Sequence, residues 1–340
     1  MKKIFFAFAL TSALFSCKKE TTTPNTTSND VSVSGFDCAG VKIAGTLTKD
    51  KVASNVTATL SYTGGNGKTY LTKSHTSTGV SGLSATLLAG TLANGEGTLV
   101  YTISGTPTTA GTANFAIALG GKSCAISIKV EDAIGKPGPN ITDSEGNSYK
   151  TITIGTQTWM AENLKFSKYS DGTTIPNIMD NTQWQNNTTG AWSYYNNDVA
   201  NNVKYGKLYN WYAVSKTSNG NKNVCPTGWH VPADAEWTVL TDYLGGFKVA
   251  GGKMKEVGVT SWLIPNTDAT NTSLFSALPG GIRYGEVALY AEVGRAGYWW
   301  SSTEFDKGSA WFRTLRNYDG IAIYANYNKW YGLSVRCLRD

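Results

Sequence analysis

Tryptophan is confined to one part of this chain. All eleven tryptophans, from Trp159 to Trp330, lie in the C-terminal part of the 340 residues, and the first 140 residues contain none. Two hydrophobic cores of different composition are the simplest explanation of this distribution. The chain is also long enough for two domains, because domains commonly have about 100–200 residues.

A segment rich in proline and glycine separates the two parts. Residues 132–140 include Pro137, Gly138 and Pro139, and this composition is typical of a linker. The sequence therefore predicts a first domain at residues 31–131 and a second domain at residues 141–340.

The N-terminus has the layout of a secretory signal. Two lysines precede the apolar run Ile4–Phe15, which is too short for a membrane-spanning helix of roughly 20 residues. The run ends in Leu-Phe-Ser-Cys, which resembles the lipobox of bacterial lipoproteins, where the cysteine receives lipid and becomes the new N-terminus. We therefore predict a signal peptide at residues 1–16 and lipidation of Cys17. A plain signal peptide with an incidental cysteine is the alternative.

The segment after Cys17 has almost nothing apolar to bury, so residues 17–30 are predicted to form a flexible tether. The lipobox resemblance implies a protein held by lipid at the bacterial outer membrane or cell surface. The net charge of +6 comes from scattered lysines and arginines. Because no basic stripe is present, nucleic acid is not an expected partner.

Four further cysteines are expected to form disulfides in an oxidising compartment. Three pairings are possible. Cys38 and Cys124 lie near the two ends of one compositional segment, whereas Cys225 and Cys337 lie in the other. We therefore favour Cys38–Cys124 and Cys225–Cys337. Zinc is the competing use, but the cysteines lack CxxC spacing and no metal site is expected.

The first domain contains short runs in which apolar and polar residues alternate. Three such runs are Val56–Tyr62, Gly97–Ser104 and Ala113–Leu119. Period-two alternation with intervening glycine, asparagine or proline predicts an all-β sandwich. Residues 104–115 also resemble the end of a bacterial immunoglobulin-like module. This domain is interpreted as a spacer that lifts the second domain from the membrane, with a binding role as the alternative.

The second domain begins with a predicted hairpin. Asn147–Met160 alternates in strand fashion, with Gly155 and Thr156 supplying the turn. Helices are predicted at Tyr205–Val214 and Val231–Gly246, because both carry apolar residues at helical spacing.

Six sequence blocks in this domain closely resemble the Fibrobacter succinogenes major paralogous domain, a family of surface and secreted modules. They cover the region from residue 141 to the C-terminus and comprise Gly155–Leu164, Tyr205–Val214, Cys225–Trp237, Leu278–Arg283, Tyr298–Glu304 and Ser334–Cys337. The family more often has threonine or serine where this chain has Ala233, and losing that helix cap should cost about 1 kcal/mol.

A more distant resemblance connects the Glu-Trp helix and the C-terminal Val-Arg-Cys segment with the C-type-lectin and formylglycine-generating-enzyme superfamily. It implies an α+β fold for the second domain. The enzymes of that superfamily use two cysteines late in the chain, whereas Tyr298–Arg336 contains none. We therefore expect no enzyme, no catalytic residue and no cofactor.

The titratable residues do not point to a catalytic site. Glu304 and Asp306 are close enough in sequence to be considered as paired carboxylates, but such pairs are common on exposed loops. His230 lacks a recognisable nucleophile, and Glu236 fits a structural role in the first turn of a helix. The Asn-rich loops supply amide oxygens, whereas calcium sites usually include several carboxylates. A calcium site is therefore not expected in these loops.

The aromatic residues provide the functional hypothesis. Trp184, Trp192 and Trp330 lie in polar, Asn-rich surroundings and are candidates for exposed platforms on which a sugar stacks. The hypothesis is a cell-surface lipoprotein that presents a lectin-like module for an extracellular glycan or a surface protein. The alternatives are a carbohydrate-active or other extracellular enzyme, which predicts converging titratable side chains, and a purely structural envelope protein.

Overall fold

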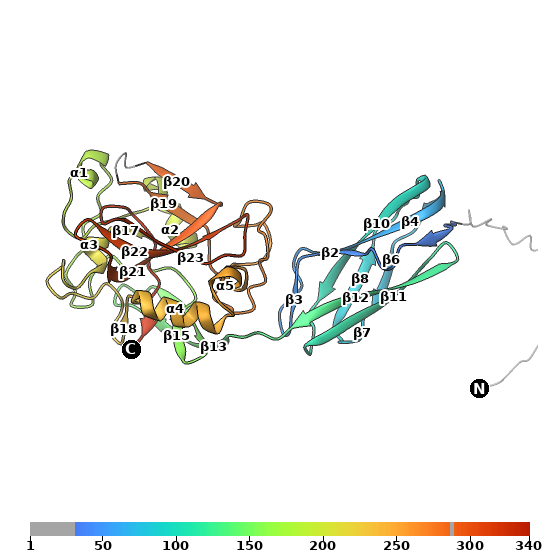
Figure 1. Ribbon diagram of the computed structural model, residues 1–340, viewed down its shortest axis with the longest axis horizontal. Helices are drawn as coiled ribbons and strands as arrows, with labels where there is room; N and C mark the ends of the chain where they lie inside the picture. The colour runs from blue at the N-terminus through green and yellow to red at the C-terminus, as the bar shows by residue number, and fades with distance from the viewer. Residues whose placement is uncertain (1–30, 286–288) are drawn as a thin grey trace, which may run out of the picture.

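The computed structural model describes residues 31–285 and 289–340 and has two lobes arranged end to end (Figure 1). The predicted signal peptide at 1–16, the tether at 17–30 and the lipidation of Cys17 lie outside the described residues. Among those described, no helix combines the length and apolar character needed to cross a membrane.

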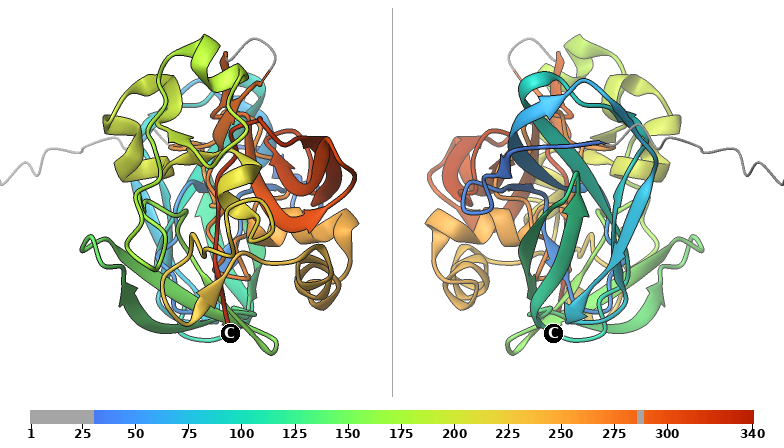
Figure 2. Two further views of the ribbon diagram at one scale, coloured as in Figure 1. Left: turned by 90° about the vertical axis from the view of Figure 1, so that its left-hand side faces the viewer. Right: turned by 90° about the vertical axis from the view of Figure 1, so that its right-hand side faces the viewer.

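The N-terminal lobe consists of two main sheets and a short two-stranded ribbon, and Figure 2 shows its layers end-on. The six-stranded sheet contains β1 (Gly35–Phe36), β2 (Lys42–Ala44), β4 (Val56–Asn66), β6 (Lys73–Thr76), β8 (Leu83–Leu87) and β10 (Asn94–Gly105). The four-stranded sheet contains β3 (Leu47–Thr48), β7 (Thr78–Gly79), β11 (Gly111–Leu119) and β12 (Lys122–Glu131). The ribbon pairs β5 (Thr69–Tyr70) with β9 (Gly90–Thr91).

The core of this lobe follows from the period-two alternation. Leu60 and Tyr101 from the first sheet share one hydrophobic cluster with Phe115 and Ile126 from the second. The three predicted strands lie within β4, β10 and β11, and the all-β prediction for this part is confirmed.

The predicted linker is partly wrong. Residues 136–140 belong to β13 (Lys136–Thr142), which pairs with β14 of the C-terminal lobe. Pro137 and Pro139 fit there because β13 is an edge strand, where a missing backbone N–H is tolerated. Only residues 132–135 therefore lie between the strands of the two lobes.

The C-terminal lobe is built on two five-stranded sheets. One has the order β13, β14 (Ser148–Ile154), β15 (Gln157–Met160), β24 (Leu338–Arg339) and β18 (Trp229–His230). The other has the order β20 (Tyr290–Val293), β19 (Gly280–Arg283), β21 (Ala296–Glu304), β22 (Ser309–Arg316) and β23 (Ile323–Asn328). The strands β16 (Trp192–Ser193) and β17 (Leu208–Tyr209) form a separate pair.

Short helices surround these sheets. They are α1 (Asn181–Gln185), the 3₁₀ turn η1 (Tyr195–Asn197), α2 (Ala200–Tyr205), α3 (Trp211–Val214), α4 (Asp234–Tyr243) and α5 (Phe247–Met254). Figure 2 shows α4 and α5 together on one side of the lobe and α1 and α2 on another.

Strand β21 divides the lobe into two aromatic cores. Trp299 packs in a cluster with Trp237 of α4, whereas its neighbour Trp300 packs with Phe312 in a second cluster. Successive side chains of a strand point to opposite faces, so one strand with two adjacent tryptophans can supply both cores. The tryptophans that the sequence concentrates in this part therefore help to fill two separate cores.

The predicted hairpin is confirmed, whereas only one of the two predicted helices is. β14 and β15 flank Gly155, which has a φ of 60°. The predicted helix at residues 205–214 is present only at its end, as α3 (Trp211–Val214), because α2 ends at Tyr205, Gly206 adopts a φ of 73° and β17 follows. A Cβ on Gly206 would lie 2.7 Å from the Leu164 carbonyl oxygen. The second predicted helix corresponds to α4.

Both predicted disulfides are present. Cys38–Cys124 links the loop after β1 to β12, and Cys225–Cys337 links the segment before β18 to the segment before β24. The second bond encloses a sequence separation of 112 residues. Each lobe is therefore crosslinked within itself.

Candidate functional site

The structure contradicts the prediction of exposed tryptophan platforms. Trp184 is 1% exposed and Trp192 is 7% exposed, and Trp330 is half-buried. Trp184 donates from Nε1 to the Trp330 carbonyl oxygen at 2.8 Å, and the Arg283 guanidinium lies 4.2 Å from its ring centre. Trp192 donates from Nε1 to the Ile175 carbonyl oxygen at 2.9 Å.

The local sequence was misleading for a geometric reason. Asp180 caps α1 by accepting from the Gln183 N–H. The other residues of this short helix are exposed and polar, and Trp184 is its one buried residue. A helix of five residues has too few apolar positions to reveal which side is buried. Polar neighbours in sequence therefore did not mean polar surroundings in space.

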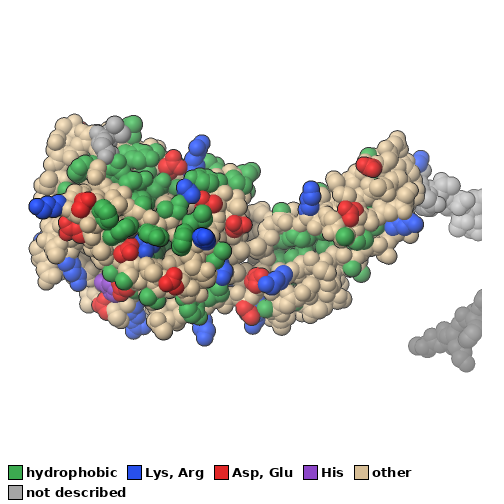
Figure 3. All heavy atoms as spheres, viewed as in Figure 1, with side chains coloured by type: hydrophobic (Ala, Val, Ile, Leu, Met, Phe, Trp, Pro, Cys, Tyr) green, Lys and Arg blue, Asp and Glu red, His purple; other side chains and the backbone are tan. Residues whose placement is uncertain are grey.

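A different set of aromatic residues is exposed. Phe305, Trp311, Tyr324 and Phe247 form a continuous series, here called the aromatic row. Consecutive ring centres lie 5.0, 6.1 and 6.0 Å apart. Phe305 is 49% exposed, Tyr324 is 52% exposed and Phe247 is 42% exposed, while Trp311 is half-buried. Figure 3 shows hydrophobic side chains gathered on this face of the C-terminal lobe.

Strand register and a helix start position the aromatic row. Trp311 of β22 lies opposite Asn326 of β23, and Arg313 lies opposite Tyr324. Trp311 and Tyr324 are therefore diagonal neighbours on one face of the sheet. Phe247 begins α5, and Phe305 follows the last residue of β21.

A polar group borders the row. The buried Arg313 guanidinium lies 5.3 Å from the Tyr324 ring centre, forms an ion pair with Asp234 and donates to Thr238 Oγ1 at 3.3 Å. The contacts with Asp234 and Thr238 fix the Arg313 guanidinium, which in turn packs against the Tyr324 ring. Exposed Asn326 and Thr238 add hydrogen-bonding groups beside the rings.

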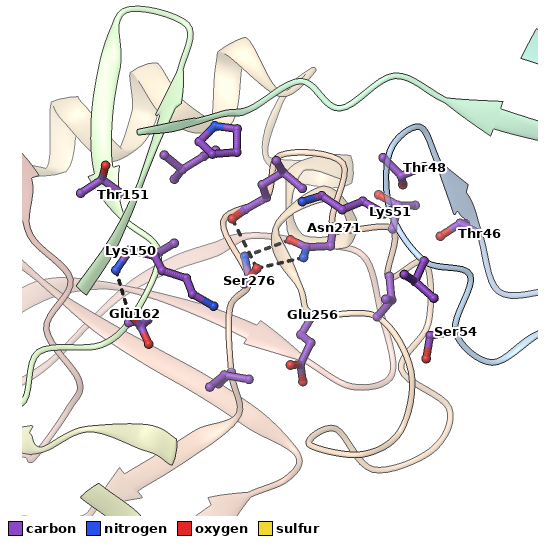
Figure 4. Close-up of a pocket in the computed structure, with 18 of the residues that line it drawn as sticks. Thr46, Thr48, Lys51, Ser54, Lys150, Thr151, Glu162, Glu256, Asn271 and Ser276 are labelled. Atoms are coloured by element: carbon purple, nitrogen blue, oxygen red, sulfur yellow. Dashed lines mark hydrogen bonds between the residues drawn. The ribbon is translucent and has the colours of Figure 1, made fainter. Parts of the chain in front are cut away.

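A cleft of about 600 Å³ lies between the two lobes. Figure 4 shows Lys51 of the N-terminal lobe directed toward Asn271 of the C-terminal lobe, with Lys150, Glu162 and Glu256 around the same space. The Lys150 backbone N–H donates to Glu162 Oε2 at 2.8 Å. The cleft mixes apolar side chains with charged groups of both signs, and it has no aromatic lining among the described residues.

A second cleft of about 590 Å³, here called the polar cleft, lies beside His230. The His230 Nδ1 lies 2.6 Å from Asp340 Oδ1, and its Nε2 lies 3.0 Å from Glu236 Oε1. On the facing strand, Glu304 Oε1 accepts from Lys329 Nζ at 2.7 Å. This arrangement brings together titratable residues that are far apart in the sequence.

The structural role expected for Glu236 agrees with its contacts. Glu236 Oε2 accepts from the Ala233 N–H at the start of α4 at 2.8 Å, which is the glutamate half of a capping box, and the other half is missing because alanine has no side-chain oxygen. Asp306 accepts backbone N–H groups within its own turn, at 2.8 Å from Gly308. Glu304 and Asp306 therefore hold different groups. Among the described residues, no set of three histidine, cysteine or acidic side chains is arranged to hold a metal.

The aromatic row had one weak signal in the sequence. Residues 323–326 read Ile-Tyr-Ala-Asn, and the structure places Tyr324 and Asn326 on the exposed side of this alternation, which ends at residue 326. The other three members come from α5, the β21–β22 turn and β22, so only the fold brings them together.

The family comparison agrees with the resemblance seen in the sequence blocks. The family model described as Fibrobacter succinogenes major domain matches residues 152–339, which is more than half of the chain. No curated protein and no solved structure matches the chain.

Proposed function

Since the chain belongs to the Fibrobacter succinogenes major domain family, we propose that its C-terminal lobe is a non-catalytic module that binds extracellular glycans. The N-terminal lobe is the spacer that presents it. In this proposal the spacer is immunoglobulin-like, the module is a C-type-lectin-like α+β domain, and lipid on Cys17 holds the protein to the outer membrane or cell surface.

The observation that carries the proposal is the exposure of the aromatic row. Aromatic side chains bury 150–250 Å² each when they are covered, so leaving several exposed in one place forgoes substantial stabilisation. Contiguous apolar patches of this kind usually mark interaction sites. The C–H faces of a sugar are apolar and can cover such rings, while its hydroxyl groups remain free for hydrogen bonds.

The polar neighbours of the row favour a sugar as the ligand. The exposed Asn326, which lies opposite Trp311 in the sheet, can exchange hydrogen bonds with hydroxyl groups beside the stacked face. Arg313 is neutralised by Asp234, so the row lacks a free buried charge that would demand an ionic ligand. A protein partner is the second candidate, because exposed tyrosine and tryptophan are also common at protein interfaces.

The test is a glycan array screen of a soluble chain that begins at Lys18, with and without calcium. Wild type should bind a subset of glycans saturably. The variants Trp311→Ala and Tyr324→Ala should lose that binding while keeping the far-ultraviolet spectrum of wild type. The matched control is Tyr318→Ala, because Tyr318 is equally exposed but lies outside the row, beside Arg316.

Two outcomes would count against the proposal. A folded wild-type chain that binds no glycan on the array would favour a protein partner or a structural role. Glycan binding that survives both row variants would place the site elsewhere on the lobe. Turnover of a bound glycan would instead support the enzyme alternative and direct attention to the polar cleft.

A further inference from the structure

We propose that the polar cleft is a second saccharide site, which takes one neutral sugar unit through the carboxylates of Glu304 and Asp340. It is separate from the aromatic row and is argued from its own groups. Its volume of about 590 Å³ falls within the range of roughly 300–1,000 Å³ typical of small-ligand sites. A single sugar, free or at the end of a glycan, fits this size.

The cleft combines an apolar floor with polar walls. Trp211, Val214 and Val231 are buried residues that line it. Trp211 is held in place because its Nε1 donates to the Ser301 carbonyl oxygen at 2.8 Å. A sugar ring has the same division, with apolar C–H groups on its faces and hydroxyl groups around its edge.

Each of the two carboxylates uses one oxygen for a hydrogen bond within the protein. The second oxygen is then the one that a ligand can reach. Glu304 uses Oε1 for Lys329, and Asp340 uses Oδ1 for His230. Both carboxylates are substantially exposed, at 45% and 61% of the side chain. An ionised carboxylate only accepts hydrogen bonds, so the second oxygens suit hydroxyl donors.

Except for the exposed Lys216, the charged side chains that line the cleft already have partners of opposite charge or a ring nitrogen beside them, which favours a neutral ligand. Lys329 stands against Glu304. The two ring nitrogens of His230 face carboxylate oxygens of Asp340 and Glu236. A ligand with its own charge would have to compete with these pairs, whereas a polyol can bond to them without replacing them.

The cleft is also lined by hydroxyl groups that can both donate and accept. Ser302 lies on β21 beside Glu304, and Thr217 also lines the cleft, where it bonds with Ser215 at an oxygen separation of 2.8 Å. Donors and acceptors around one cleft are what adjacent sugar hydroxyls require.

The test is an NMR titration of the soluble chain beginning at Lys18 with D-glucose, D-galactose, D-mannose and D-xylose as separate probes. Saturable shifts should appear for the Trp211 indole with at least one sugar. Glu304→Gln keeps the size of the side chain and an oxygen for Lys329, and it should weaken binding about tenfold or more, because hydrogen bonds to charged groups are the strong ones.

A second variant protects the test against misfolding. Thr217→Trp fills the cleft from an exposed position and leaves both ion pairs intact, so it should abolish the shifts. Asp306→Asn is the matched control, because Asp306 is a nearby exposed acid that does not line the cleft. Tyr324→Ala should also bind the sugar normally, which separates this site from the aromatic row.

The inference is overturned if none of the four sugars shifts the wild-type spectrum saturably. It is also overturned if Glu304→Gln and Thr217→Trp both bind as wild type does. Neither result would affect glycan binding by the row, which depends on different residues.

Discussion

Arg336 donates from Nη2 to Oδ1 of Asn163 at 3.0 Å in the interior of the C-terminal lobe, where both side chains are buried. The two residues are 173 positions apart. Trp299 Nε1 donates to the same oxygen at 2.8 Å, and a second guanidinium nitrogen donates to the Phe275 carbonyl oxygen. This network connects the start of the lobe with its last strands.

Replacing Arg336 with methionine should destabilise the C-terminal lobe by about 1–3 kcal/mol, because the buried Phe275 carbonyl oxygen loses its donor, whereas Asn163 Oδ1 keeps the bond from Trp299. Tryptophan fluorescence during urea unfolding measures this lobe alone, since every tryptophan lies in it. Arg339→Met is the control, because Arg339 is exposed. Equal midpoints for the two variants would contradict the role assigned to the network.

Lys255 predicts a specific dependence of stability on pH. The residue is fully buried, and its Nζ donates to the carbonyl oxygens of Thr267, Arg316 and Asp319 at 2.7, 2.9 and 2.8 Å. Loss of hydration lowers the pKa of Lys255 to about 8, against about 10.4 for an unfolded chain. Between these values the unfolded chain binds more protons than the folded chain, so this group's contribution to stability rises with pH.

The comparison is between wild type and Lys255→Met, which lacks this titration. The free energy of unfolding of wild type relative to the variant should increase from about pH 8 to about pH 10. The exposed residue Lys248 provides the control variant Lys248→Met. A constant difference across this range would show that the folded-state pKa of Lys255 is not lowered.

Removing Cys225–Cys337 should cost the C-terminal lobe on the order of 4 kcal/mol. The bond closes a separation of 112 residues, and the chain-entropy model gives a value of this size. The double variant Cys225→Ala, Cys337→Ala should unfold at lower urea by tryptophan fluorescence. A reducing agent should shift wild type toward the variant and leave the variant unchanged. A reductant effect on the variant would point to the other disulfide.

Trp184 is predicted to matter for stability and not as a surface platform. Replacing it with alanine removes a buried ring that contacts Arg283, and large-to-small changes of buried aromatics cost about 3–5 kcal/mol. Tyr324→Ala, in the exposed aromatic row, should change stability by less than about 1 kcal/mol. Thermal unfolding of both variants measures the contrast, and similar melting temperatures would argue that Trp184 is not a core residue.

The proposed lipid anchor leads to a prediction in the native cell. Cys17→Ser should move the protein from the membrane fraction to a soluble fraction, because a serine cannot receive the thioether-linked lipid. Both globular lobes should remain intact by protease resistance. Membrane association that persists in the variant would favour a different mode of attachment.

Local patterns predicted the elements whose signals lie within a few residues of one another. The strands of the N-terminal lobe, the hairpin around Gly155 and the helix α4 all follow from alternation, a left-handed turn residue or helical spacing. The helix expected at residues 205–214 is reduced to α3 because β17 pairs with β16, which is a contact outside the segment. The predicted exposure of Trp184 is wrong for a similar reason, since its contacts with Trp330 and Arg283 come from distant parts of the chain.

The sequence alone predicted the all-β character of the first lobe and the family of the second, and it favoured the cysteine pairing that the structure shows among three possible ones. These depend on composition, spacing and ordered motifs, which are properties of the chain itself. Only the tertiary structure decided which aromatic rings are exposed and which charged groups meet. Phe247 and Tyr324, or His230 and Asp340, become neighbours because sheet pairing and two packed cores bring distant segments together, and no local pattern encodes that proximity.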